Sequence, residues 1–186
     1  MINSKEIMRA AEGLVKTYGT RDPETIARAM GLQVVTVDTL EKLLGMYTYR
    51  WRHGIILLNG CMEDVMRRMV CGHELGHHML HRQRAKDITW QEFNLFNIRD
   101  RSEYEANAFL AHLTLDTDRV IEAARQGQDV VGMAGEMYTN VNVMLIKLQE
   151  LQSLGYGLRV PMEPDARFFS HIDGKDGGAN GADGTV

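Results

Sequence analysis

Two histidines four residues apart, with a glutamate directly after the first, form the segment His73-Glu74-Leu75-Gly76-His77. In a helix these histidines lie on one face, about 6 Å apart along the axis, so both imidazoles can bind one metal ion. Glu74 is rotated by about 100° from His73, which lets its carboxylate reach a metal-bound water instead of the metal. We therefore predict His73 and His77 as metal ligands, Zn²⁺ as the metal and Glu74 as a catalytic base.

A catalytic zinc needs a third protein ligand, and the neighbouring histidines do not supply it. His81 lies about 12 Å along the helix axis from His73, too far for two ligand bonds of about 2.1 Å to one ion. His78 points about 100° away from His77. The third ligand must therefore come from another part of the chain.

The segment 102–109, Ser-Glu-Tyr-Glu-Ala-Asn-Ala-Phe, is the best source of that ligand. Glu103 and Asn107 share a helix face, so Glu103 can complete the site while Asn107 bonds the outer nitrogen of a ligand histidine. Glu105 lies about 200° round the helix from Glu103 and cannot do the same job from the same face. Both glutamates are also ordinary acids of a first helical turn, where the helix dipole favours them. The residues alone leave these alternatives open.

The elements that must position these groups can be read from apolar spacing, caps and turn residues. They predict helices at 4–18, 23–30, 61–82 and 102–115, one from 117, and a pair within 129–154. Strands are expected at 32–37, 46–51 and 55–58, with a turn at 52–54. The alternating strand 46–51 suits an edge, and the continuous apolar run 55–58 suits a strand covered on both faces. The expected fold is α+β, mostly helical, with a small antiparallel sheet of about three strands beside the zinc-binding helix.

The bulk composition is that of a globular protein. The chain has 186 residues, 44% hydrophobic and 25% charged, with a net charge of −4, which argues against nucleic acid as the main ligand. It lacks the ~20-residue apolar run of a membrane span, and its start lacks the pattern of a signal peptide. Cys61 and Cys71 are expected as free buried thiols, which indicates the cytoplasm. We expect one domain over 1–160, with its C-terminal helical pair at about 129–155, and a tail, 161–186, largely disordered from about 170.

The zinc motif, followed by Leu80-His81 and then by the Glu-x-x-x-Asn helix of Glu103 and Asn107, resembles the ImmA/IrrE family of metallopeptidases. The resemblance covers roughly 1–155. It implies a gluzincin-like site in which the first glutamate of that helix, Glu103, is the third zinc ligand. It also implies an intracellular endopeptidase of a phage, prophage or mobile element that cleaves a transcriptional repressor.

Hydrolysis of a peptide bond by such a site usually has a second donor for the oxyanion. The sequence offers five candidates without choosing among them: Tyr47, Tyr49, His53, Tyr104 and His112. The edge strand 46–51 is a place where an extended substrate could pair by strand addition, although Arg50, Trp51 and Arg52 also suit an ordinary hairpin.

Three other functions fit parts of the sequence. The helices at 129–154 could form a helix-turn-helix DNA-binding unit, which a salt-dependent binding assay would reveal. The zinc could serve a regulatory or interaction module without peptidase activity, in which case a closed four-ligand site is expected. The same zinc chemistry would also hydrolyse a non-protein amide.

Overall fold

The structure is a computed structural model that describes residues 3–40, 43–50, 52–83 and 101–158. Residues 84–100 and the whole of the tail 161–186 lie outside the described residues. The elements are α1 Ser4–Tyr18, α2 Pro23–Ala29, β1 Gln33–Val37, β2 Gly45–Arg50, β3 His53–Asn59, α3 Asp64–His81, α4 Arg101–Thr114, α5 Thr117–Arg125, α6 Val130–Glu136 and α7 Val141–Ser153. The mostly helical α+β fold is thereby confirmed. In the described ranges, every helix is too short or too polar to cross a membrane.

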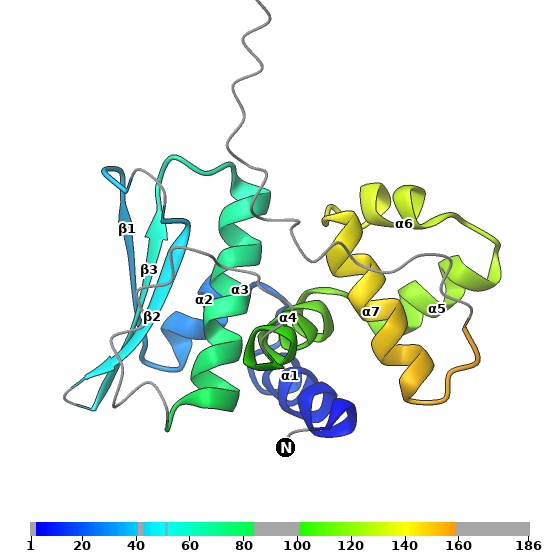
Figure 1. The fold of residues 1–186 in the computed structure, drawn as a ribbon, viewed down its shortest axis with the longest axis horizontal. Helices are drawn as coiled ribbons and strands as arrows, with labels where there is room; N and C mark the ends of the chain where they lie inside the picture. Colours follow the sequence, from blue (N-terminus) through cyan, green and yellow to red (C-terminus); the bar gives the residue numbers. More distant parts are fainter. Residues whose placement is uncertain (1–2, 41–42, 51, 84–100, 159–186) are drawn as a thin grey trace, which may run out of the picture.

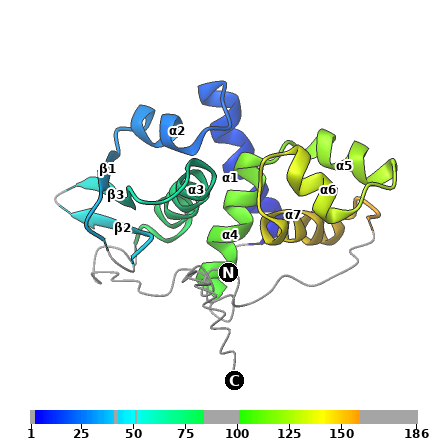
Figure 2. The same cartoon turned by 90° about the horizontal axis from the view of Figure 1, so that it is seen from above.

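The elements follow one another in layers (Figure 1). The sheet packs on α3, α3 packs on α4, and α4 also contacts α1 and α7. Seen from above, α1 and α4 separate the sheet and α3 from the group α5–α7 (Figure 2). Helix α4 is therefore the central element, with α3 and its motif on one side and the C-terminal helices on the other.

The three strands are arranged in the order β1-β3-β2. The hairpin β2–β3 is antiparallel as expected, but β1 pairs with β3 in parallel, so the expectation of an antiparallel sheet was wrong for that pair. After β1 the chain crosses to β2 at the far edge of the sheet and then returns as β3 in the centre. The central position suits β3 because the most apolar strand buries most of its surface there. On β3, Gly54, Ile56 and Leu58 are buried. Ile55 and Leu57 on the other face are only half-buried, contrary to the expectation that both faces of 55–58 are covered.

Several predicted boundaries were shifted. Arg50 pairs with His53, so the expected turn 52–54 is shorter and His53 belongs to β3. Helix α3 begins at Asp64 and not near Cys61; the Cys61 thiol is exposed, while Cys71 is buried as expected. Helix α4 already includes Arg101, one residue before the predicted start, and Ser102 is buried in its first turn.

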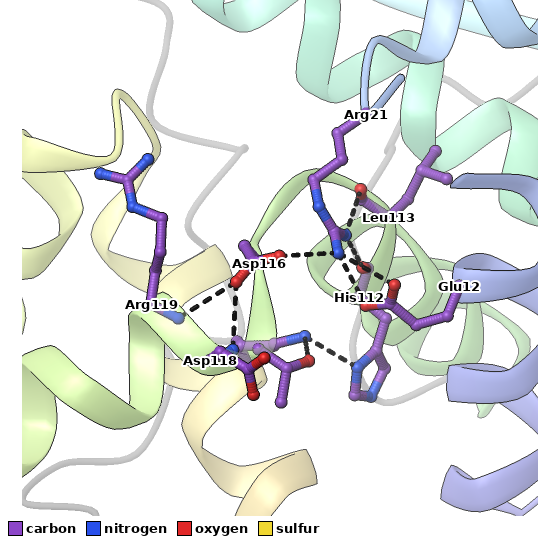
Figure 3. A network of polar contacts seen from close by, with 9 residues as sticks. Glu12, Arg21, His112, Leu113, Asp116, Asp118 and Arg119 are labelled. Atoms are coloured by element: carbon purple, nitrogen blue, oxygen red, sulfur yellow. Dashed lines mark hydrogen bonds and ion pairs between the residues drawn. The ribbon is translucent and has the colours of Figure 1, made fainter. Parts of the chain in front are cut away.

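A polar network ties the end of α4 to the N-terminal helices (Figure 3). The Arg21 guanidinium lies 2.9 Å from the Glu12 carboxylate of α1 and 3.1 Å from Asp116, the N-cap of α5. It also donates to the backbone carbonyls of His112 and Leu113, each at 3.1 Å. Carbonyls in the last turn of a helix have no partner within it, so Arg21 stabilises this end of α4.

A buried lysine extends this network to α7. Lys147 is fully buried, and its Nζ lies 3.1 Å from His112 Nδ1 and 3.0 Å from Thr117 Oγ1. One turn along α7, the Glu150 carboxylate accepts a hydrogen bond of 2.6 Å from Tyr104. Its other oxygen lies 3.5 Å from His112 Nε2. Polar contacts therefore hold α4 against α7 along much of its length.

Candidate metal centre

The motif of α3 faces the acidic first turn of α4 because the two helices approach closely. A Cβ added to Gly76 would lie 3.0 Å from the backbone oxygen of Ala106 and 3.3 Å from the Phe109 ring. Only glycine leaves room for backbone to pass this close. Gly76 therefore sets the distance between α3 and Glu103.

His73, His77 and Glu103 converge at this contact, and their potential ligand atoms all lie within 4.8 Å of one another. The two Nε2 atoms are 2.9 Å apart. The Glu103 oxygens lie 3.2 Å from Nε2 of His73 and 3.4 Å from Nε2 of His77. All three side chains are buried. We call these three residues the metal centre.

The outer nitrogens of both histidines contact fixed partners. His73 Nδ1 lies 2.9 Å from Asn107 Oδ1, which is the contact that the shared face of Glu103 and Asn107 suggested. His77 Nδ1 lies 3.1 Å from Nδ1 of His81. A neutral imidazole that donates from Nδ1 presents a bare lone pair at Nε2.

The residues of the metal centre fit a divalent cation. Burial lowers the pKa of His77 to about 4, so its ring is neutral, the form that binds metal, at physiological pH. Burial alone would raise the pKa of Glu103, but the two imidazoles outweigh it and hold that pKa below its usual range. A carboxylate and two imidazole lone pairs, gathered away from water, have the composition of a two-histidine, one-glutamate zinc site.

Glu74 lies beside this centre with the properties of an acid–base group. Its side chain is 3% exposed. Burial, followed by the nearby charge of Glu103, raises the pKa of Glu74 well above its usual value, although a hydrogen bond from the Tyr47 backbone acts the other way. Among the described residues, Glu74 Oε1 has no hydrogen-bond partner. A carboxylate with a raised pKa can both take up and release a proton near neutral pH.

The five candidate oxyanion donors separate into two groups. The hydroxyl of Tyr104 and the ring of His112 both contact the α7 side chains of the buried network. The Tyr47 hydroxyl lies 2.8 Å from His78 Nδ1, and the Tyr49 hydroxyl accepts from Arg82. Tyr47 and Tyr49 lie on β2, the strand whose backbone bonds Glu74 through Tyr47. His53 lies at the start of β3, where it pairs with Arg50 at the other end of β2.

Two residues beside the metal centre were missed as partners of the ligands. His81 was rejected only as a ligand, and Glu105 was considered only as an alternative to Glu103. His81 Nε2 lies 3.0 Å from Glu105 Oε2, while its other nitrogen faces His77. The four-residue step from His77 to His81 was the available signal, since side chains at that spacing touch on a helix.

Comparison with known proteins agrees with this geometry. The family model described as the IrrE N-terminal-like domain, a peptidase family, matches residues 27–138, which include the whole metal centre. This match is narrower than the range of about 1–155 suggested by the resemblance. The chain is also 35% identical over 109 residues to "Uncharacterized immunity region protein 2" of Bacillus phage phi105, a match that covers 59% of this chain and 68% of that protein. The chain therefore belongs to the IrrE/ImmA-like family of metallopeptidases.

Proposed function

We propose that this protein is a zinc-dependent endopeptidase in which His73, His77 and Glu103 hold the metal. The convergence of two imidazole nitrogens and one carboxylate in a buried centre carries this proposal. Asn107 is proposed to orient His73 by accepting from its Nδ1, as partners of metal-bound histidines commonly do. Membership of a metallopeptidase family supports the same assignment.

Glu74 is proposed as the general base. When bound, zinc would supply Lewis-acid chemistry that acidifies water and polarises a carbonyl. The Glu74 carboxylate takes the proton of the attacking water and later delivers it to the leaving amine. Its raised pKa suits both steps, because the proton must be held and then released near neutral pH. The hydrogen bond from the Tyr47 backbone keeps the carboxylate in place between these steps.

The edge strand β2 is proposed to bind the substrate in an extended conformation. In the described part of the sheet, β2 has a strand neighbour only at β3, so its other backbone edge can take an added strand. The backbone of Tyr47 on β2 is bonded to Glu74. A peptide paired with β2 would therefore pass beside the catalytic base.

We further propose that the substrate is a transcriptional repressor of a phage or mobile element, cleaved in the cytoplasm. The similarity to a protein named for the immunity region of a phage is compatible with this choice. We also infer that 1–160 forms one peptidase domain, since a single apolar core includes residues of α1, the sheet and α7.

The test is to incubate the zinc-loaded protein with the repressor encoded nearest to its gene and to identify the fragments by mass spectrometry. Glu74→Gln should bind zinc as the wild type does and leave the repressor intact, because the amide keeps the shape but cannot take a proton. Turnover of Glu74→Gln at the wild-type rate would refute the mechanism. Zinc binding without cleavage of any peptide by the wild type would favour the regulatory module.

A further inference from the structure

Three groups extend from the metal centre toward the end of α3: His77, His81 and Glu105. His77 Nδ1 faces His81 Nδ1 at 3.1 Å, and His81 Nε2 faces Glu105 Oε2 at 3.0 Å. The Nε of Arg101 donates to the second oxygen of Glu105 at 2.8 Å. His77, His81 and Glu105 are all buried, with exposed fractions of 5%, 8% and 7%.

The hydrogen atoms along this chain can be placed by elimination. Glu105 accepts from Arg101, and an ionised carboxylate offers acceptors only, so the contact to His81 must use an N–H at His81 Nε2. With a neutral His81 ring, that one proton leaves His81 Nδ1 as the acceptor of the Nδ1–H of His77. His77 then directs its Nε2 lone pair into the metal centre, where a bound cation would replace the 2.9 Å contact between the Nε2 atoms of His73 and His77.

We infer that His81 and Glu105 are positioning residues that hold His77 in the ring orientation and tautomer that bind the metal. Neither residue belongs to the metal centre of His73, His77 and Glu103. The inference rests on the proposed metal site and assigns the outer partners of its second histidine.

The corresponding contact of His73 lacks this directional control. Its partner is the amide of Asn107, whose oxygen accepts and whose nitrogen donates, so rotation of the amide would satisfy either tautomer of His73. At His77 the direction is set by a carboxylate that cannot donate. Loss of the His81 contact should therefore cost metal affinity even when α3 and α4 remain folded.

The first measurement is nitrogen NMR of the zinc-loaded wild type, labelled with ¹⁵N-histidine, at neutral pH. We expect the Nδ1–H form at His77 and the Nε2–H form at His81. A proton at Nδ1 of His81 would overturn the inference without any variant having been made.

The second measurement is zinc affinity, by competition with a coloured chelator. His81→Leu removes the acceptor and should weaken zinc binding by about 10- to 100-fold. His81→Gln should recover most of that loss, because its side-chain oxygen can accept from His77. A side chain that only fills the same volume could not restore the affinity. Glu105→Gln should give a mixture of His81 tautomers by NMR, because an amide, unlike a carboxylate, can donate as well as accept and no longer fixes the direction.

His78→Gln is the matched control. It is the same substitution on the same helix, but the His78 ring contacts Tyr47 and not a ligand, so zinc affinity should stay at the wild-type value. The melting temperatures of the wild type and of His81→Leu show whether the variant is folded. If the folded variant bound zinc as tightly as the wild type, this inference would be overturned and the proposed metal site would stand. Failure of the wild type to bind zinc would instead refute the proposed metal site, and the inference with it.

Discussion

Replacement of Gly76 by alanine tests whether the close approach of α3 and α4 builds the metal centre. The new Cβ would lie 3.1 Å from the Cα of Ala106 and 3.0 Å from its oxygen. Carbon atoms in contact prefer about 3.5–4.0 Å, and backbone cannot rotate away, so the helices must separate by roughly half an ångström. Glu103 lies three residues before Ala106 and would move with it.

The expected cost of Gly76→Ala combines two opposing effects. Overpacking typically costs about 1–3 kcal/mol, whereas alanine gains about 1 kcal/mol over glycine in a helix. We expect a net loss of up to about 2 kcal/mol in the free energy of unfolding, at roughly 2–4 °C in melting temperature per kcal/mol for this chain length. Zinc affinity should fall at least about tenfold, because a loss of only about 1.4 kcal/mol in binding free energy from the misplaced Glu103 gives that factor.

Gly13→Ala provides the matched control for this change. Gly13 also lies inside a helix, α1, but a Cβ there would have nothing within 4 Å. This variant should gain up to about 1 kcal/mol by helix propensity and keep its zinc affinity. Both variants can be compared by urea unfolding of the metal-free protein and by chelator competition. If Gly76→Ala matched Gly13→Ala in stability and in zinc affinity, the reasoning from helix contact would be refuted.

Three further predictions concern charge and metal. Zinc should raise the melting temperature, by more the tighter it binds. Glu103→Gln should therefore show a smaller rise in a thermal-shift assay, and an undiminished rise would exclude Glu103 as a ligand. The metal-free protein should lose stability as pH falls from about 6.5 to about 4, because unfolded His77 takes up a proton at its ordinary pKa of 6.5 while the folded residue does so only near 4. Urea unfolding across this range should be less pH-dependent in His77→Gln, and equal slopes would contradict this. Burial lowers the pKa of Lys147 from 10.5 to about 8, so the wild type should gain stability over Lys147→Met as pH rises through that window; a constant difference would show that Lys147 does not titrate there.

Local rules explain what the sequence by itself determined. Helix geometry alone puts His73 and His77 on one face, whatever packs against it. Helix starts at Ser4, Pro23 and Thr117 were predictable because a residue beside each, namely Asn3, Asp22 and Asp116, caps it through its own side chain. The pattern of β2 and β3 likewise determined which strand lies at the edge and which at the centre.

Only the tertiary structure decided which groups meet across elements. Glu103 and Glu105 are equivalent acids in one helical turn, and it is the approach of α3 at Gly76 that brings Glu103 to the histidines and leaves Glu105 to His81. The parallel pairing of β1 depends on a crossing of the chain that no local pattern records. Tyr104 and His112 likewise contact α7, at Glu150 and Lys147. The packing of α4 on α7 determines these contacts, and the periodicity of α4 alone does not predict them.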